Sequence, residues 1–184
     1  MIRIRPTRSP HRSRAAFRLR LAFGFTMIEL MVVVGVIAVL ALLAAPSISD
    51  RIVRDQIVDA SKLIEFAKPP IQVSWTTLAT MPVDNAAAGL PPATSIVNNV
   101  VSSVAIESGA IQVTFGNRAN AALRGKILSF RPGVVEASPI VPITWVCGHA
   151  EPPVPMTARG LDKTTVPDRY LPLNCRPRPA AAAP

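Results

Sequence analysis

One acidic side chain stands at the front of the most apolar stretch of this chain. Glu29 precedes a run, Leu30 to Ser49, that contains no charged side chain. An unpaired carboxylate is costly to bury among apolar groups, and a neighbouring cation offsets that cost. Glu29 is therefore either a stray acid at a membrane interface or a group that requires a cationic partner. The chemistry it indicates is ionic pairing rather than catalysis.

No set of residues suited to catalysis accompanies this acid. The chain has two histidines, His11 and His149, which makes a Ser-His-Asp or Cys-His site implausible. No phosphate-binding glycine loop is present, and the carboxylates are not grouped as an acid–base pair would be. We therefore predict that the protein is not an enzyme and needs no cofactor.

The two cysteines, Cys147 and Cys175, are both close to the C-terminus. A zinc site would need four ligands, and only His149 is nearby, so we predict no metal site. If this region lies outside the cytoplasm, where disulfides persist, the pair predicts one bridge. Closing a loop of this length would stabilise the fold by about 3.6 kcal/mol in the chain-entropy treatment.

The positive charge of the chain is concentrated at its start. The formal net charge is +9, which by itself would suggest a nucleic-acid binder. Residues 1–24, however, hold several arginines and no acid: Arg3, Arg5, Arg8, Arg12, Arg14, Arg18 and Arg20. Because arginines before an apolar helix hold that end in the cytoplasm, we interpret them mainly as a topology signal.

Residues 25–49 are predicted to form a membrane helix. As an α-helix the uncharged run is about 30 Å long, which matches the hydrocarbon core of a bilayer. Residues 1–24 are then a basic leader that is removed, with an ordinary secretory signal or an uncleaved signal anchor as alternatives. Gly35 and Pro46 either let this helix bend and extend or are ordinary residues of a membrane segment.

Residues 50–175 predict one globular domain that begins with a helix. Apolar residues recur at helical spacing from Val53 to Ala67, so the membrane helix should continue as an amphipathic one. The pair Pro69-Pro70 should end or bend it. Residues 71–78 fit either a strand or a helix, and a proline in the first turn favours the helix.

Four strands are expected after a loop at residues 80–99, namely 100–107, 110–115, 126–130 and 140–147. Ser108-Gly109 is a two-residue hairpin signal between the first two. Short connections imply an antiparallel sheet with one face covered by the helix, which is an α+β fold. Trp75 and Trp145 should lie in the core and His149 in an exposed loop. Residues 176–184 should be disordered.

Together these motifs resemble a type IV pilin, and more narrowly a major pilin of the type IVa kind. At the N-terminus the resemblance is carried by the Gly24-Phe25 junction with Glu29 and Pro46. Further along it is carried by short strings at residues 84–91, 125–128, 143–148 and 170–172. The family implies a ladle-shaped subunit, with a long N-terminal helix packed on a four-stranded antiparallel sheet. It also implies a disulfide-closed C-terminal loop on the filament surface.

The resemblance further implies roles for the residues around the junction. A prepilin peptidase would cut after Gly24, where a missing side chain allows close backbone approach, and would methylate the amine of Phe25. The alternative is that Gly24 only breaks a helix. The new ammonium group would pair with Glu29 of a neighbouring subunit and set the axial register of a helical filament.

The function implied is that of a major structural subunit. It would begin as a single-pass inner-membrane protein with its N-terminus in the cytoplasm and end in a surface pilus. Such pili serve adhesion and twitching motility, and DNA uptake is left open. The partners would be further copies, the peptidase and an assembly machinery with cytoplasmic ATPases. The alternatives are a minor pilin, a type II secretion pseudopilin, typically stabilised by calcium, and a membrane-anchored periplasmic binding module.

Overall fold

The structure is a computed structural model that describes residues 24–178, without the side chains of residues 44–48. The predicted leader therefore lies outside the described residues except for Gly24, and so does most of the predicted tail. The chain divides into two compact units, one up to Leu42 and the other from Leu43 onward. Only the second unit has a buried core among the described residues.

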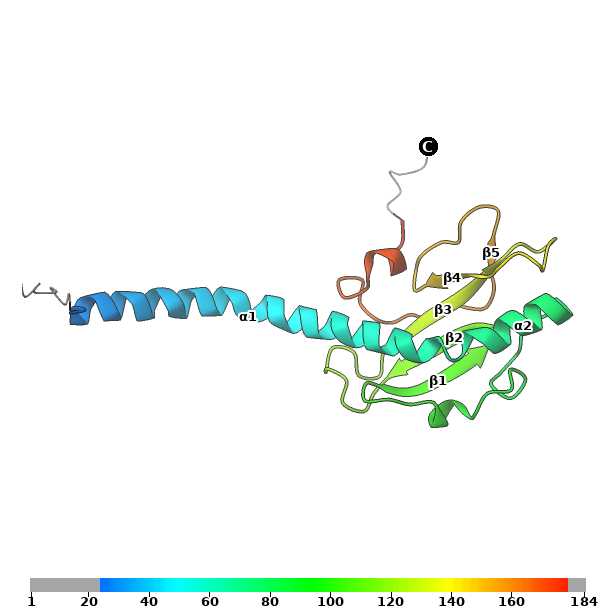
Figure 1. Cartoon of the computed structure of the whole chain (residues 1–184), viewed down its shortest axis with the longest axis horizontal. Coiled ribbons are helices and arrows are strands. Elements are labelled where there is room, and N and C mark those ends of the chain that lie inside the picture. The colour runs from blue at the N-terminus through cyan, green and yellow to red at the C-terminus, as the bar shows by residue number, and fades with distance from the viewer. Residues whose placement is uncertain (1–23, 179–184) are drawn as a thin grey trace, which may run out of the picture. The chain divides into compact units, whose positions relative to one another are not determined.

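Helix α1 spans Met27–Ile64 and begins with a side-chain cap (Figure 1). The Thr26 hydroxyl accepts the backbone N–H of Glu29 at 3.2 Å, and the Thr26 carbonyl accepts that of Leu30 at 3.2 Å. A threonine followed three residues later by a glutamate is the pattern of a capping box. The helix expected from residue 25 and its expected amphipathic continuation are thus one element.

Helix α1 ends at Ile64, earlier than the Ala67 predicted from the apolar pattern. The rings of Pro69 and Pro70 would meet the carbonyls four positions earlier, so regular helix cannot continue through residues 65–66. A second helix, α2, spans Lys68–Leu78 and holds both prolines in its first turn, where their missing N–H groups are not needed. The preference for a helix over a strand at residues 71–78 is confirmed.

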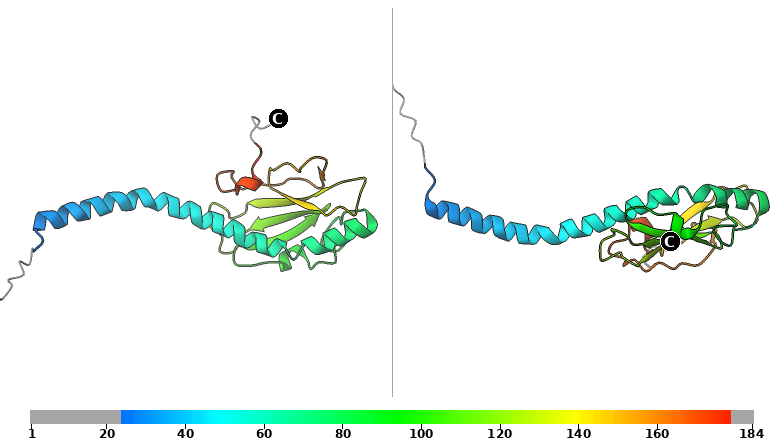
Figure 2. Two further views of the ribbon diagram at one scale, coloured as in Figure 1. Left: turned by 45° about the horizontal axis from the view of Figure 1, so that its top comes forward. Right: turned by 90° about the horizontal axis from the view of Figure 1, so that it is seen from below.

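The apolar stripe predicted after residue 50 is buried. Its members are at most 2% exposed: Val53, Ile57, Ala60, Ile64 and Ala67. Ile71 and Trp75 extend the stripe along α2 and are also buried, so the expectation that Trp75 belongs to the core is confirmed. Figures 1 and 2 show this part of α1, together with α2, lying across one face of the sheet.

The sheet has the strand order β1-β2-β3-β4, and each neighbouring pair is antiparallel. The strands are β1 Val101–Glu107, β2 Ala110–Phe115, β3 Ile127–Val134 and β4 Thr144–Cys147. Ser108 and Gly109 form the predicted hairpin turn, with φ values of 49° and 83° that both lie in the left-handed region. Single-turn 3-10 helices lie in the loops at η1 Ala93–Ser95 and η2 Leu173–Cys175. The predicted α+β fold is confirmed.

Strand β3 continues beyond Phe130, where the prediction ended it. The Pro132 carbonyl accepts the N–H of Arg159 at 2.8 Å, so the nitrogen of Pro132 faces the same side, past the end of β2. Its missing N–H therefore costs no hydrogen bond to β2. Past the end of β2, a short strand that was not predicted, β5 Thr157–Ala158, pairs with β3.

Strand β4 is shorter than predicted, because it begins at Thr144 rather than at Ile140. Residues 140–143 form turns and irregular chain, and Ile140 is 85% exposed. Pro139 and Pro142 explain the difference, since neither can donate to a strand ladder. Trp145 of β4 is half-buried and packs against the core from outside, so its predicted core position is only partly correct.

Candidate assembly surface

Glu29 lies in the first turn of α1 with its side chain exposed. Thr26 fixes this turn by accepting the Glu29 N–H, and the positive end of the helix favours a carboxylate there. No role was predicted for Thr26, although its spacing to Glu29 is a recognisable capping signal. In the described chain, no Lys, Arg or His nitrogen lies within 4.0 Å of the Glu29 carboxylate. The predicted pairing of Glu29 with a cation stays a prediction.

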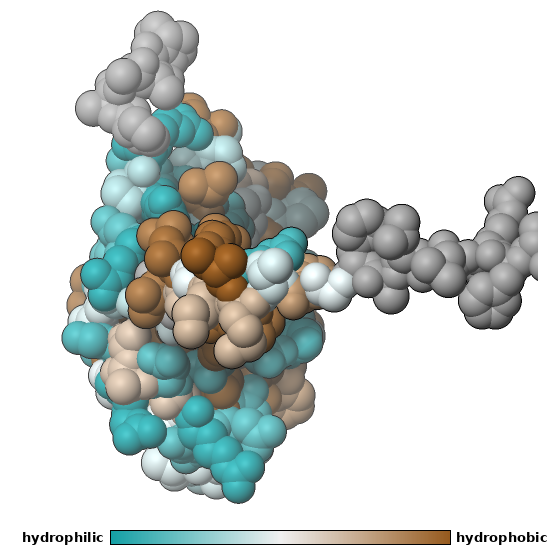
Figure 3. Space-filling model, turned by 90° about the vertical axis from the view of Figure 1, so that its left-hand side faces the viewer, coloured by the Kyte–Doolittle hydropathy of each residue, from teal (hydrophilic) through white to brown (hydrophobic). Residues whose placement is uncertain are grey.

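The large apolar side chains that follow Glu29 are exposed on all sides of the helix. Between Leu30 and Leu43 their exposed fractions run from 45% to 75%. Figure 3, in which the beginning of α1 faces the viewer, shows apolar side chains in brown gathered there. An exposed apolar surface of this extent marks a site of contact with other molecules.

The part of the chain that the structure describes contains no helix that combines the length and the apolar character needed to cross a membrane. Among the described residues the predicted cleavage junction is open: Phe25 is 81% exposed, and a side chain added at Gly24 would meet none of their atoms within 4 Å. Gly35 has equally open surroundings inside α1, whereas Pro46 is among the residues whose side chains are not described. The membrane helix predicted at residues 25–49 and the predicted roles of these residues stay predictions.

The predicted disulfide is confirmed. Cys147, at the end of β4, is bonded to Cys175 in η2, with a Cα–Cα distance of 4.6 Å. Gly148 beside the bridge has a φ of 55°, and a Cβ there would lie 2.7 Å from the Cys175 carbonyl oxygen. Only glycine fits so close to the backbone in this conformation. The bridge thereby fixes both ends of the C-terminal segment, residues 147–175.

A buried polar network that was not predicted fastens the C-terminal segment to the sheet. The Ser129 hydroxyl of β3 donates to Oε1 of Gln112 at 2.6 Å and accepts the N–H of Lys163 at 2.7 Å. Gln112 of β2 donates in turn to the Leu161 carbonyl at 2.9 Å. Gln112 and Ser129 are at most 3% exposed, so removing either would leave buried polar groups unpaired. A glutamine inside an apolar strand was the available sequence signal.

His149 is not simply an exposed loop residue, as was predicted, because it joins two parts of the C-terminal segment. Its Nδ1 lies 2.8 Å from Asp162 Oδ2, and its Nε2 lies 3.7 Å from Asp168 Oδ1. Burial raises the pKa of the Asp162 carboxyl, but hydrogen bonds from Thr164 and His149 outweigh it, so this pKa is lowered overall. Within residues 24–178, no cluster of His, Cys, Asp and Glu is arranged to hold a metal ion.

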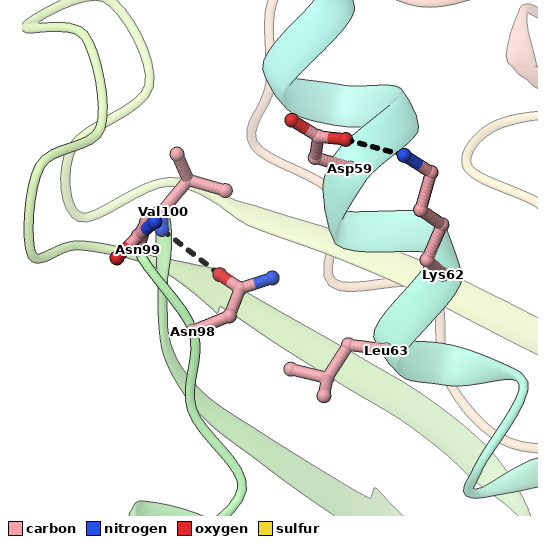
Figure 4. A pocket seen from close by; sticks show the side chains of 6 residues that line it. All are labelled: Asp59, Lys62, Leu63, Asn98, Asn99 and Val100. Atoms are coloured by element: carbon pink, nitrogen blue, oxygen red, sulfur yellow. Dashed lines mark hydrogen bonds and ion pairs between the residues drawn. The ribbon is translucent and has the colours of Figure 1, made fainter.

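A shallow depression lies between α1 and the residues that precede β1 (Figure 4). On the α1 side, Lys62 donates to Asp59 at 2.8 Å, and this hydrogen bond raises the pKa of the Lys62 ammonium. On the other side, Asn98 Oδ1 accepts the Val100 N–H at 2.8 Å. These groups are therefore paired with their own neighbours and are not arranged around a ligand.

Comparison with known proteins agrees with this arrangement. The family model described as pilin (bacterial filament) matches residues 53–176. The chain is 30% identical over 164 residues to type IV major pilin protein PilE of Neisseria gonorrhoeae, covering 83% of this chain and 93% of that protein. It is 30% identical over 156 residues to fimbrial protein EcpC of Eikenella corrodens, with coverages of 83% and 90%. A fimbrial protein of Neisseria meningitidis serogroup A is 31% identical over 127 residues, with coverages of 68% and 72%.

The family match extends from the amphipathic part of α1 across the sheet to the disulfide. It therefore covers the unit that has its own core, and the relatives extend the similarity over most of the chain. Pilins are structural proteins, which agrees with the prediction that the chain is not an enzyme. From its fold, its disulfide and these matches, the chain belongs to the pilin family of bacterial filament proteins.

Proposed function

We propose that this protein is the major structural subunit of a type IV pilus and polymerises through the N-terminal part of α1. The observation that carries the proposal is the exposed apolar surface of that part, with the single acid Glu29 at its start. The second unit buries a core of its own, so its folding does not require this surface. The names of the relatives, major pilin and fimbrial protein, support the same role.

The register of the filament would come from a charge pair between neighbours. Cleavage after Gly24 would expose an α-amino group on Phe25, and methylation would keep its positive charge. Burying each large apolar side chain of a helix bundle contributes about 1.5–3 kcal/mol. Such contacts are non-directional, so they do not fix the axial position of one subunit relative to the next. An unpaired buried carboxylate costs several kcal/mol. The axial position at which Glu29 meets a neighbour's Phe25 ammonium is therefore favoured over the others. Apolar burial would thus supply affinity and the ion pair would supply register.

The route to the filament would begin in the inner membrane. The uncharged run from Leu30 to Ser49 would anchor the subunit there, with the arginine-rich leader on the cytoplasmic side. The partners would be a prepilin peptidase and an assembly machinery whose cytoplasmic ATPases supply the energy, because a pilin itself supplies none. Adhesion, twitching motility and DNA uptake would then be properties of the surface filament. The Cys147–Cys175 bridge favours a pilin over a calcium-stabilised pseudopilin.

The test is the surface material sheared from cells in which this chain is the only pilin expressed. We expect filaments in electron micrographs, and mass spectrometry of the main protein band should find N-methylated Phe25 at the N-terminus. Gly24→Leu should accumulate as an uncut precursor, whereas Gly35→Leu should still be cut. A soluble monomer that retains its leader would contradict the proposal.

A further inference from the structure

Two arginine side chains from distant parts of the sequence converge on one backbone carbonyl. Nη2 of Arg54, on α1, lies 3.0 Å from the carbonyl oxygen of Arg169, and Nη2 of Arg176 lies 3.4 Å from the same oxygen. The two Nη2 atoms are therefore at most 6.4 Å apart, the sum of those distances. In Figure 1 the C-terminal segment runs from yellow through orange to red, and the hydrogen bond from Arg54 joins the later part of this segment to α1.

A third arginine adjoins this pair, because Arg169 itself supplies the carbonyl on which they converge. Arg169 stacks over the ring of Tyr170, with its Cζ 4.6 Å from the ring centre, and Tyr170 itself is buried. Arg176 is held in place by a second bond, from its Nε to the Leu171 carbonyl at 2.9 Å. We call Arg54, Arg169 and Arg176 the arginine cluster. Backbone contacts hold the side chains of Arg54 and Arg176 in place, and the Tyr170 ring holds that of Arg169, but none of these contacts neutralises a charge.

No acid balances the arginine cluster among residues 24–178. No carboxylate oxygen of these residues lies within 4.0 Å of any of the three guanidinium groups. Asp168, adjacent in sequence, lies near His149 instead, at 3.7 Å. The guanidinium groups of Arg54 and Arg176 are held close enough to repel one another, and several of their N–H donors have no acceptor among residues 24–178. A planar guanidinium fork matches a phosphate group better than any other common anion partner except a carboxylate.

The position of Arg54 along α1 indicates which anion is near. Arg54 follows Ser49, the last residue of the uncharged run, by about 7.5 Å along the helix axis. The headgroup layer on each side of a bilayer is about 5–8 Å thick. If the run lies in the membrane, as the proposed function requires, Arg54 on the same helix falls within the headgroup layer, at the level of the phosphates.

We propose that the arginine cluster binds the phosphodiester headgroup of an anionic phospholipid while the subunit waits in the membrane. This rests on the proposed function, because a chain that does not insert would not bring the cluster to the headgroups. The contact would hold the globular unit against the membrane surface next to α1. Entry into a filament would have to break it.

The experiment uses the full chain in detergent micelles and in vesicles. Binding of phosphatidylglycerol is measured by titration with native mass spectrometry, and insertion is measured by flotation with phosphatidylcholine vesicles. Arg54→Gln should weaken phosphatidylglycerol binding about tenfold, and Arg54→Gln with Arg176→Gln should weaken it further, because each loses a fork contact. Arg159→Gln is the matched control, since it removes one charge from the ion pair with Glu136 and should change little.

The outcomes separate this proposal from the proposed function. Flotation without any loss of lipid binding in the cluster variants would overturn the headgroup site and leave the membrane anchor intact. Tight binding of inorganic phosphate to the chain in micelles would also overturn it, by showing a site for a free anion. Normal lipid binding with lost filaments in Arg54→Gln would assign the cluster to a neighbouring subunit's carboxylate instead. Failure to float with any vesicle would contradict the proposed function itself.

Discussion

Helix α1 has a first part, up to Leu43, whose large apolar side chains are exposed, and a second part, from Val53, whose apolar side chains are buried. Ile37 in the first part is 59% exposed, whereas Ile57 in the second part is 2% exposed, although both are isoleucines of one helix. The second part packs on a sheet of the same chain, whereas the first part contributes no residue to the buried core of the described residues. This difference in exposure indicates that only the second part of the helix is needed for folding. The first part is then available for contacts with other molecules.

The largest effect should come from removing the one acid of the first part. Glu29→Ala should reduce the yield of sheared surface filaments at least tenfold, because subunits lose the pair that sets their height. The measurement is the amount of pilin in the sheared fraction relative to the pilin in whole cells. Asp55→Ala removes an acid from the second part of the same helix and should leave that ratio nearly unchanged. A normal yield of filaments from Glu29→Ala would contradict the claim that the first part of α1 differs from the second in its role in assembly.

The next effect tests the second part by stability. Ile57→Ala should lower the free energy of unfolding by about 2–5 kcal/mol, since it opens a cavity under the helix. Ile37→Ala makes the same chemical change in the first part and should lower it by less than about 0.5 kcal/mol. Urea unfolding of the chain in detergent micelles, followed by tryptophan fluorescence, measures both. Equal losses would show that the two parts are not energetically distinct.

The disulfide should matter for the second unit alone. Cys147→Ser combined with Cys175→Ser should cost about 2–4 kcal/mol of unfolding free energy, because the open chain gains conformational entropy when unfolded. Precursor cleavage at Gly24 should continue at its normal rate, as it depends on the first part. An immunoblot for processed subunit and an unfolding curve check the two halves of this prediction.

The smallest effect is a pH dependence in the C-terminal segment. The pKa of Asp162 is lowered in the folded protein from its ordinary value of 3.8, so its contribution to stability is fully present above that value. It is lost as the pH falls through the lower folded pKa. The unfolding temperature should therefore drop more steeply below about pH 4 in the native chain than in Asp162→Asn. Identical profiles would rule out this contribution.

Local patterns predicted most of the fold. Apolar residues at helical spacing located the buried stripe around Ile57, and Ser108-Gly109 located the hairpin, because each feature depends only on neighbours in sequence. The disulfide was predictable because the chain has only two cysteines. The end of α1 was missed by three residues, since Pro69 and Pro70 act on carbonyls four positions earlier.

Features that depend on distant residues could not be predicted from the sequence. Asn85 donates to the Val104 carbonyl at 3.0 Å and accepts the Ile106 N–H at 2.7 Å, and nothing near Asn85 announces these partners. The contacts of Gln112 and His149 have the same character. The candidate assembly surface differs from these features, because the local motif around Glu29 is enough to predict it. The cation predicted to pair with Glu29 belongs to another molecule.

Electron cryo-microscopy of the assembled filament tests the pairing of Glu29 with a neighbouring subunit most directly. We predict that the nitrogen of Phe25 in one subunit lies within about 4 Å of the Glu29 carboxylate of a neighbour, along a core of packed α1 helices. A map in which Glu29 faces solvent, or in which Phe25 nitrogens lie far from every carboxylate, would contradict the account.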